Sequence, residues 1–443
     1  YSLHMVGGDT LSQVLLFVLA GVFASMLLVG YRTRLASVVS WILLCSLQNR
    51  NTLVLHAGDD LLRLMLFWSM FVPLGARWSV DAAAGDRVPG RAGASRSLLS
   101  LGTLALVMQL LSMYLISAAL QSGPSWHRDG SALQLVLGHH AFVTAFGQWF
   151  RQLPPHVLQG LTWQLWWLER CGPLLFFVPW NTYWWRTLAV LAFTGLNLWL
   201  FLTLELGLLP WVAMVYWLAI LPSWFWDGPA YRLCVRAGVL GKLRTLAQGT
   251  QAFCARQRKW LGPLRSPGRI RPTWIGSVVV LVLASVAGYG SAHAMTHGGS
   301  LTAPRFAPLL MTGLSANWGL FAPDPPTTSG WLVSVAKQKS GEEIDVWNDG
   351  RSVSFDQPEL PSATYRRSRW RKLADTMASE DHAGVRSHFA RWLCREWNED
   401  HTGLQRVQSI TLYQMAQTAN FDGTGNASVS KHQLARENCP ATP

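Results

Sequence analysis

The chain carries little charge for its length and lacks the short motifs that mark the common enzyme sites. Only 14% of its 443 residues are charged, whereas soluble domains are nearer a quarter. Its six cysteines contain no CxxC pair, so we expect no metal site. Gly-rich phosphate loops, HExxH and GxSxG are also missing, which removes the usual sequence signals for nucleotide, zinc-protease and hydrolase chemistry.

Long apolar runs stand where the charge is missing. Half of the residues are hydrophobic, 24 are Trp, and the mean hydropathy is +0.18. These runs dominate residues 1–294, whereas 300–443 has the composition of a soluble protein. We therefore predict a transmembrane domain at 1–294 and a water-facing domain at 295–443. About eight stretches have the length of a membrane span: 11–30, 36–55, 61–76, 98–120, 157–179, 187–205, 208–226 and 273–294.

The net charge of +13 does not indicate nucleic-acid binding, because the basic residues are unevenly placed. Ten of them, and no acid, lie between Gly228 and Pro272. The positive-inside rule makes this stretch, 228–272, a cytoplasmic loop. Counting spans back puts the arginine-bearing loops 31–35 and 77–97 on the same side. The N-terminus and the C-terminal domain then lie outside, and a cytoplasmic true N-terminus would require one more span upstream.

The C-terminal domain has the pattern of a small α+β fold. Asp349-Gly350 between two alternating runs predicts a hairpin. Cys394 and Cys439 either form a disulfide, in an oxidising compartment, or stay free. Alternation predicts strands within 330–356 and at 406–417, and helical spacing predicts helices at 367–378 and 382–399.

Segment 131–152 is amphipathic rather than uniformly apolar, and Pro154-Pro155 ends it. A helix lying in the membrane interface, or a re-entrant segment, therefore fits better than a span. Tryptophans gather near the predicted span ends, where an aromatic belt accounts for most of them.

Polar residues cluster at the outer ends of the second and third spans: Asn49, Arg50, Asn51, His56, Asp59, Asp60 and Arg63. Arg63 lies three and four residues after the two aspartates, so it can pair with either on a helix. Such a cluster is either a salt-bridged cap that locks two helices or a ligand site, because ionisable groups at membrane depth are costly.

Other ionisable residues provide three candidate catalytic groups, His139, His140 and Glu169. Glu169 lies inside the fifth span, and its neighbour Arg170 points about 100° away, so we expect the two to have different partners. The histidines face the outer interface. The alternative to catalysis is structural pairing inside the bundle for Glu169 and a hydrogen-bonded structural role for the two histidines.

Several stretches resemble the bacterial HTTM (horizontally transferred transmembrane) family, relatives of the vitamin K-dependent γ-carboxylase. They are 1–4, 30–34, 46–51, 58–63, 73–81, 126–133, 168–175 and 317–325. The resemblance adds Trp126 to the polar cluster as a binding or structural residue. It also implies a helix before the Ser-Leu-His segment, in agreement with the span expected upstream.

The resemblance implies quinone chemistry, but this sequence lacks the lysine that catalyses it in the family's enzyme. In the family's eukaryotic enzyme a lysine-bearing site oxidises a reduced naphthoquinone, and the resulting base deprotonates a glutamate that then adds CO2. A buried lysine suits this task because burial leaves it a free amine. The matching position here is Gln121 or Leu120, and an amide cannot act as that base. Phe193-Thr194 also stands where many relatives have Phe-His, and fold alone does not carry function.

Three hypotheses follow. The first, which the missing lysine favours, is a non-catalytic structural or accessory subunit of a bacterial inner-membrane assembly, with the lipid bilayer and other protein subunits as partners. The second is a quinone-dependent carboxylase-like enzyme with rearranged catalytic residues. The third is a quinone- or lipid-binding membrane module. All three place the chain in the inner membrane, with the C-terminal domain periplasmic.

Overall fold

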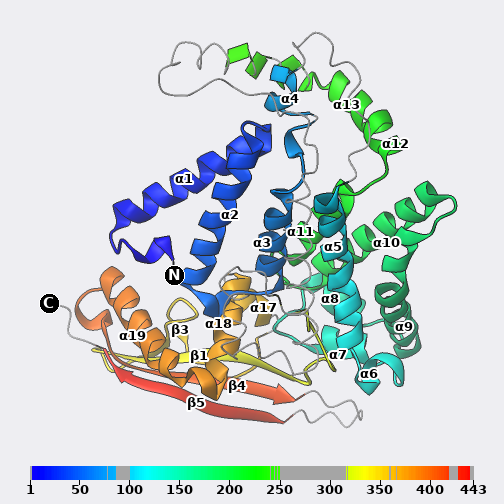
Figure 1. Ribbon diagram of the computed structural model, residues 1–443. Helices are drawn as coiled ribbons and strands as arrows, with labels where there is room; N and C mark the ends of the chain where they lie inside the picture. The colour runs from blue at the N-terminus through cyan, green and yellow to red at the C-terminus, as the bar shows by residue number, and fades with distance from the viewer. Residues whose placement is uncertain are drawn as a thin grey trace.

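The computed structural model describes residues 2–76, 78–85, 100–239, 241–243, 245–246, 248–249, 316, 318–358, 361–365, 367–418 and 428–439. These residues form a helical bundle and a C-terminal five-stranded sheet (Figure 1). The predicted span 273–294 and most of the basic loop fall outside the described residues. The two-part composition of the sequence thus corresponds to two kinds of structure.

Three described helices are long and apolar enough to cross a membrane: α1 (Thr10–Val29), α5 (Leu101–Leu120) and α10 (Thr182–Thr203). Side-chain caps define where two of them begin. The Asp9 carboxylate accepts from the Ser12 backbone N–H at 2.9 Å, and Ser100 caps α5 in the same way, satisfying otherwise orphaned donors. A fourth span would join α11 (Leu209–Ala219) to Ser223–Arg236 across a bend of 84°.

Three further predicted spans form shorter helices, so the count of about eight is not confirmed. They are α2 (Thr33–Arg50), α3 (Ala57–Ser69) and α9 (Pro155–Cys171). Helix α9 ends where Gly172-Pro173 turns the chain into the 3-10 helix η4 (Gly172–Phe177), because proline cannot continue the helical hydrogen bonds. The minor helices are η1 (Leu3–Met5), η2 (Thr52–Val54), η3 (Leu74–Ala76), α4 (Val80–Gly85), α6 (Pro124–His127), α12 (Ser223–Phe225), η5 (Trp226–Ala230) and α13 (Tyr231–Arg236).

The amphipathic segment 131–152 is not one helix. It forms α7 (Ala132–Gly138) and α8 (Ala145–Phe150), joined by a loop that carries His139 and His140. Val143 in that loop makes an isolated antiparallel bridge with Leu204. Apolar residues of α7 and the loop pack against the end of α10, so this part of the segment is buried by protein, whereas Phe146 and Trp149 of α8 are exposed.

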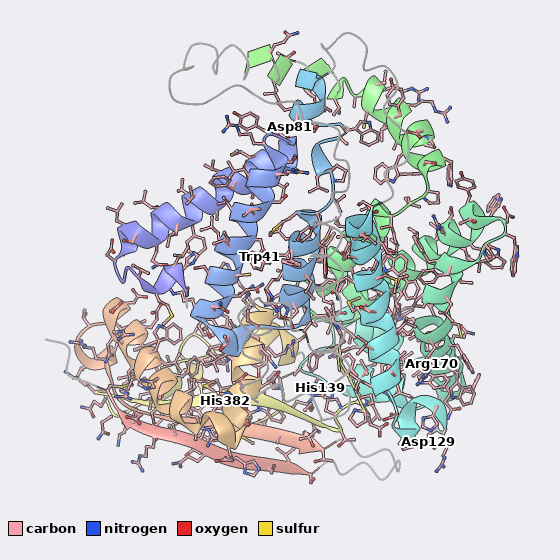
Figure 2. The ribbon with its side chains drawn as sticks, in the orientation of Figure 1. Trp41, Asp81, Asp129, His139, Arg170 and His382 are labelled. Atoms are coloured by element: carbon pink, nitrogen blue, oxygen red, sulfur yellow. A yellow bond between two sulfur atoms is a disulfide. The ribbon has the colours of Figure 1, made fainter. Side chains whose placement is uncertain are left out.

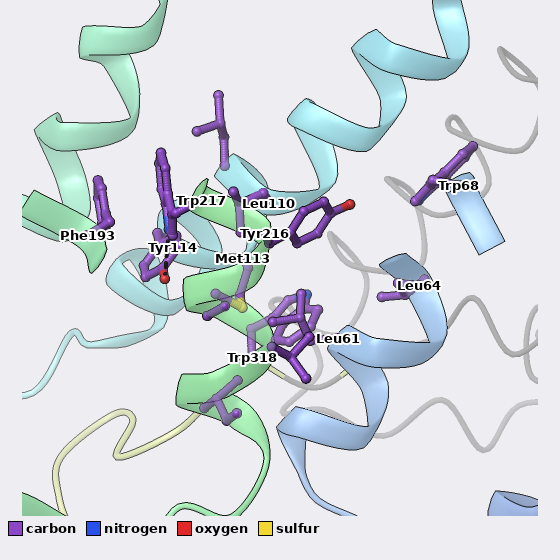
Figure 3. Packing of buried hydrophobic residues seen from close by; sticks show 14 of the residues in the cluster. Leu61, Leu64, Trp68, Leu110, Met113, Tyr114, Phe193, Tyr216, Trp217 and Trp318 are labelled. Carbon is purple, nitrogen blue, oxygen red and sulfur yellow. Dashed lines mark hydrogen bonds between the residues drawn. The ribbon is translucent and has the colours of Figure 1, made fainter. Parts of the chain in front are cut away.

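The bundle core is rich in aromatic side chains (Figure 3). Phe193 and Trp217 stack with ring centroids 4.5 Å apart, and Trp217 and Tyr216 have no exposed surface. Trp217 Nε1 donates to the Tyr114 hydroxyl at 3.1 Å, which satisfies a buried indole as such residues require. This core holds α3, α5, α10 and α11 together.

The C-terminal sheet is entirely antiparallel in the order β3-β2-β1-β4-β5. Its strands are β1 (Thr328–Gln338), β2 (Glu343–Asp345), β3 (Arg351–Ser352), β4 (Val407–Thr418) and β5 (Val429–Asn438). Asp349 and Gly350 both have positive φ in the β2–β3 hairpin, which confirms the turn expected there. Strand β5 was not predicted, because its charged, polar sequence has no apolar alternation.

Two amphipathic helices, α18 (Ser368–Ala378) and α19 (Ala383–Asp400), cover one face of the sheet. Short helices precede and follow them: α17 (Pro361–Thr364), η7 (Glu380–His382) and η8 (Gly403–Gln405). A disulfide joins Cys394 of α19 to Cys439 just after β5, with the two Cα atoms 5.5 Å apart. Helix α18 lies between the sheet and the bundle (Figure 1), and it makes the contacts described next.

Candidate functional site

The outer polar cluster lies at the contact between the bundle and the C-terminal domain. We call this contact the junction, defined by α17 and α18 with residues 48–63, 139–143 and 204–207. Three side chains of the C-terminal domain donate to bundle backbone carbonyls there. Ser362 donates to Val143 at 2.6 Å, Thr376 to Leu53 at 3.1 Å and Arg371 to Glu205 at 3.3 Å.

Asp59 is the centre of the junction. The residue is 1% exposed, and its carboxylate accepts from the Arg369 guanidinium at 2.8 Å. The same carboxylate accepts from the His56 backbone N–H at 3.2 Å, which caps α3. It also lies 3.4 Å from the His56 ring. Burial is the main reason that the pKa of His56 is lowered. Asp59 therefore ties the start of α3 to a helix more than 300 residues away.

Glycines bring the backbone close around this centre. A Cβ on Gly58 would meet the Leu209 backbone nitrogen at 2.5 Å, so the start of α3 approaches the start of α11 closely. Gly207 has φ +65°, and a Cβ there would lie 2.7 Å from the His56 ring. Both positions require glycine, the second for its conformation as well.

Asp60, Arg63 and Gln48 form a second set of contacts on the bundle side. Arg63 pairs with Asp60 at 2.7 Å and donates to the Gln48 side chain at 2.6 Å. Gln48 in turn donates to the Asp59 carbonyl at 3.0 Å. The sequence left open which aspartate would pair with Arg63. The structure divides them, Asp60 to Arg63 and Asp59 to Arg369.

The remaining members of the predicted cluster have other contacts. Arg50 donates to Gln13 near the start of α1 at 2.6 Å. Asn51 caps the 3-10 helix η2 by accepting from the Leu53 backbone N–H. Trp126, in α6, donates to the Phe321 carbonyl at 3.1 Å, in a separate contact. Asn49 also has a partner. The structure therefore gathers the 56–63 residues but not Trp126.

His139 lies at the junction, where Arg371 is its nearby charge. The Arg371 guanidinium sits 3.7 Å above the Phe142 ring, and that ring is 4.7 Å from the His139 ring. Burial, and after it the charge of Arg371, lower the pKa of His139 to about 4. Burial, and then Arg151, also lower the pKa of His140. Both histidines are therefore neutral at pH 7, as a general base must be.

Glu169 belongs to a different site, inside the bundle. Gln121 Nε2 donates to its carboxylate at 3.0 Å. The neighbouring guanidinium of Arg170 instead stacks 3.9 Å above the Trp166 ring, as the expected difference in direction implies. Figure 2 labels Arg170 and His139 at separate places in the fold. The three catalytic candidates thus do not form one constellation.

A buried amide network lies beside Glu169. Asn197, which is 2% exposed, donates to the Tyr114 hydroxyl at 2.8 Å and to the Phe193 carbonyl at 2.7 Å. Sequence reasoning passed over Asn197, although a polar residue within an apolar helix was a visible signal. It also missed Arg369 and Arg371, for which the sequence offers no sign of their partners.

The chemistry available at these sites is limited. Gln121, at one of the two positions that the resemblance matches to the family's lysine, offers Glu169 an amide and not a free amine. Among the described residues, no three His, Cys, Asp or Glu side chains are placed to hold a metal ion.

No family model, curated protein or solved structure matches the chain. The HTTM resemblance therefore remains a prediction from the residues quoted above.

Proposed function

We propose that this chain is a non-catalytic HTTM-like membrane protein that serves as a structural or accessory subunit of a bacterial inner-membrane assembly. The observation that carries the proposal is the ion pair between Asp59 and Arg369. The polar residues that could have formed an open substrate site are instead committed to fastening the C-terminal domain onto the bundle. A site already filled by the protein's own side chains has little room for turnover.

The proposed placement is multi-pass, with about eight spans in 1–294. Helices α1, α5 and α10 support it by their length and hydropathy. The Cys394–Cys439 disulfide supports a periplasmic C-terminal domain, since disulfides persist in oxidising compartments. The 228–272 loop would then face the cytoplasm, beside anionic lipid.

Gentle detergent extraction from native membranes, followed by sizing and mass spectrometry, tests this proposal. We expect the chain in a particle with stoichiometric partner subunits. Quinone-dependent turnover by the purified protein is the alternative, and it would be lost in Glu169→Gln or His140→Ala. Such turnover would overturn the accessory role and favour a rearranged carboxylase-like enzyme.

A quinone- or lipid-binding module without turnover is the second candidate. The buried carboxylate and amides of Glu169, Gln121 and Asn197 favour it, because they place hydrogen-bonding groups in an apolar bundle. Extraction followed by mass spectrometry of small molecules would detect a bound quinone. A purified chain that carries stoichiometric quinone and no partner subunits would select this candidate over the accessory role.

A further inference from the structure

A cavity of about 780 Å³ opens at the end of the bundle away from the sheet, where the start of α10 meets α12 and η5 (Figure 1). Its volume lies within the range of small-molecule sites. It is lined by Tyr183, Trp184, Thr187 and Leu191 of α10, Ser223 and Trp224 of α12, and Asp227 of η5. These residues belong neither to the junction nor to the Glu169 site, so the cavity needs an explanation of its own.

The walls of the cavity are held in place by the fold. The chain bends by 84° between α11 and the helical stretch Ser223–Arg236, and this bend brings α12 alongside α10. Trp224 Nε1 donates to the Thr187 hydroxyl at 3.3 Å, and that hydroxyl donates to the Tyr183 carbonyl at 2.6 Å. The Trp224 ring is therefore oriented by α10, whereas a residue of a simple aromatic belt needs only to reach the headgroup level.

Asp227 gives the cavity a negative charge that this part of the sequence otherwise lacks. No other Asp or Glu occurs between Glu205 and Asp324. Asp227 lies in η5, a single π-helical turn that contains Pro229, and such turns are frequent at functional sites. It already has a partner within the chain. Because a carboxylate has about four acceptor positions, it can accept from a ligand as well.

Aromatic faces beside a carboxylate form a site for a cation. The negative face of an aromatic ring attracts an ammonium group, and a carboxylate accepts charge-assisted hydrogen bonds from it. Tyr183, Trp184 and Trp224 are 61%, 72% and 48% exposed, so their rings are open to a ligand. The same arrangement disfavours a purely anionic ligand, because Asp227 would repel it.

The cavity is also apolar at one end. Tyr183, Thr187 and Leu191 are spaced at i, i+4 and i+8, so they share one face of α10 over about 12 Å. In the proposed placement, Asp227 directly precedes the cytoplasmic loop and lies at the headgroup level. Leu191 then lies deeper, in the hydrocarbon. A ligand that fits both ends has a cationic head and an apolar tail.

We infer that the cavity binds a phospholipid of the cytoplasmic leaflet whose headgroup ends in an ammonium, as ethanolamine does. The phosphate of such a lipid suits the basic residues that follow Asp227, of which Arg232 and Arg236 in α13 are exposed, because clustered bases attract lipid phosphates. A lysine side chain would match the acid but not these bases. The inference rests on the proposed membrane placement and goes beyond the accessory role.

Native mass spectrometry of the full chain in detergent tests the site. With a short-chain phosphatidylethanolamine as the probe, we expect one tightly held lipid per chain. The same lipid with its amine acetylated, and phosphatidylglycerol, should bind about tenfold more weakly, because each lacks the cation. Free phosphoethanolamine should compete poorly, because it lacks the tail that lies along Leu191.

Asp227→Asn should lower the affinity for phosphatidylethanolamine about tenfold and remove its preference over the acetylated lipid. Asp227→Glu keeps the charge and should keep that preference. Trp224→Leu should weaken binding about threefold, because one aromatic face is lost. An unchanged elution volume on size exclusion would show that each variant has folded.

Asp129→Asn and Trp180→Leu are the matched controls. Asp129 is an exposed carboxylate and Trp180 an exposed indole, and both lie outside the cavity. Both variants should leave the affinity unchanged. Equal loss in Trp180→Leu and Trp224→Leu would show that general aromatic anchoring, and not the cavity, holds the lipid, and would overturn the site.

Carbodiimide coupling in native membranes identifies the occupant, because it joins a carboxylate to an adjacent primary amine as an amide. Peptide mapping should find Asp227 joined to an ethanolamine phospholipid. Asp227 joined instead to Lys242 or Lys259 would show that the chain fills its own cavity, and would overturn the inference. Equal binding of the acetylated lipid, or competition by phosphoethanolamine as strong as by the lipid, would overturn it too.

The accessory role can fail independently of this site. A cavity that binds no lipid in a chain that still co-purifies with partner subunits would overturn the lipid site alone. A lone chain that retains the lipid through Asp227 would overturn the accessory role and leave the lipid site standing.

Discussion

Asp59 and Glu169 are both carboxylates removed from water, yet the molecule holds them by different means. Asp59 lies at the junction, where the guanidinium of Arg369 and the α3 N-terminus both attract its charge. Glu169 lies inside the bundle and is held by the neutral amide of Gln121. The first carboxylate depends on being charged. The second depends on being able to accept a hydrogen bond.

The two carboxylates therefore have different structural roles. A charge pair between segments more than 300 residues apart has a single arrangement that satisfies it, so it fixes how the C-terminal domain sits on the bundle. A neutral hydrogen bond in an apolar core satisfies a polar group without selecting a distant partner. The junction therefore sets the position of the domain, whereas the Glu169 site adjusts the interior of one helix bundle.

The largest expected effect comes from removing the cation at the junction. Arg369→Met would leave Asp59 buried with the His56 ring and backbone donors only. Loss of one partner of a buried pair costs 3–5 kcal/mol, and the 43% exposure of Arg369 reduces this to about 2–3 kcal/mol. Denaturant unfolding and protease release of the C-terminal domain would measure the loss.

Arg367→Met is the matched control for that variant, because Arg367 precedes the same helix and its side chain makes no cap hydrogen bond. It should change stability by less than about 0.5 kcal/mol. Equal losses in the two variants would show that general charge on α18, and not the pair with Asp59, holds the domain in place.

Whether a feature of the fold or the site could be predicted from the sequence depends on how far apart along the chain the interacting residues lie. The Arg63 pairing, the hairpin at Asp349-Gly350 and the helices at 367–378 and 382–399 rest on local spacing, and the structure has all of them. Asp59 was named as a site residue for its depth. Its partner Arg369 could not be named, because no local pattern connects residues separated by 310 positions.

The predictions that failed also depended on tertiary contacts that local sequence patterns do not reveal. Hydropathy ranks a segment by composition, but helix length is set by breakers and tertiary contacts, so Gly172-Pro173 cut short the span expected at 157–179. Strand β5 has no apolar alternation, because it is an exposed edge strand that pairs only with β4. Edge strands commonly carry such charges, which hides them from a search for period-two patterns.

Acid should weaken the junction more than the bundle. The pKa of His139 falls from 6.5 to about 4 on burial, so between these values the folded state binds fewer protons than the unfolded state. Stability is therefore full above pH 6.5 and declines as the pH falls toward 4. From pH 7.5 to pH 5 the loss should reach about 2 kcal/mol. Protease release of the C-terminal domain across that range would follow it.

His139→Asn should flatten this dependence in part, because the lowered pKa of His56 contributes with the same sign. The groups whose charge acts on His139 are Arg371 and, once protonated, His140; the pKa of His140 is itself lowered by burial and by Arg151, so it contributes with the same sign. A pH profile unchanged by His139→Asn would assign the acid sensitivity to His56, to His140 or to the carboxylates of the junction.

The smallest effect should come from neutralising the carboxylate whose hydrogen-bond donor Gln121 is neutral. Glu169→Gln keeps the shape and an acceptor for the Gln121 amide, so unfolding in detergent should change by less than about 1 kcal/mol. Asp59→Asn, the same chemical change at the junction, should cost about twice as much, because it removes a charge-assisted bond to Arg369. The pair of isosteric variants isolates the value of charge at each place. If Glu169→Gln proves the more damaging of the two, then Glu169 uses its charge for more than its bond to Gln121, and the bundle interior, not the junction, becomes the place to look for chemistry.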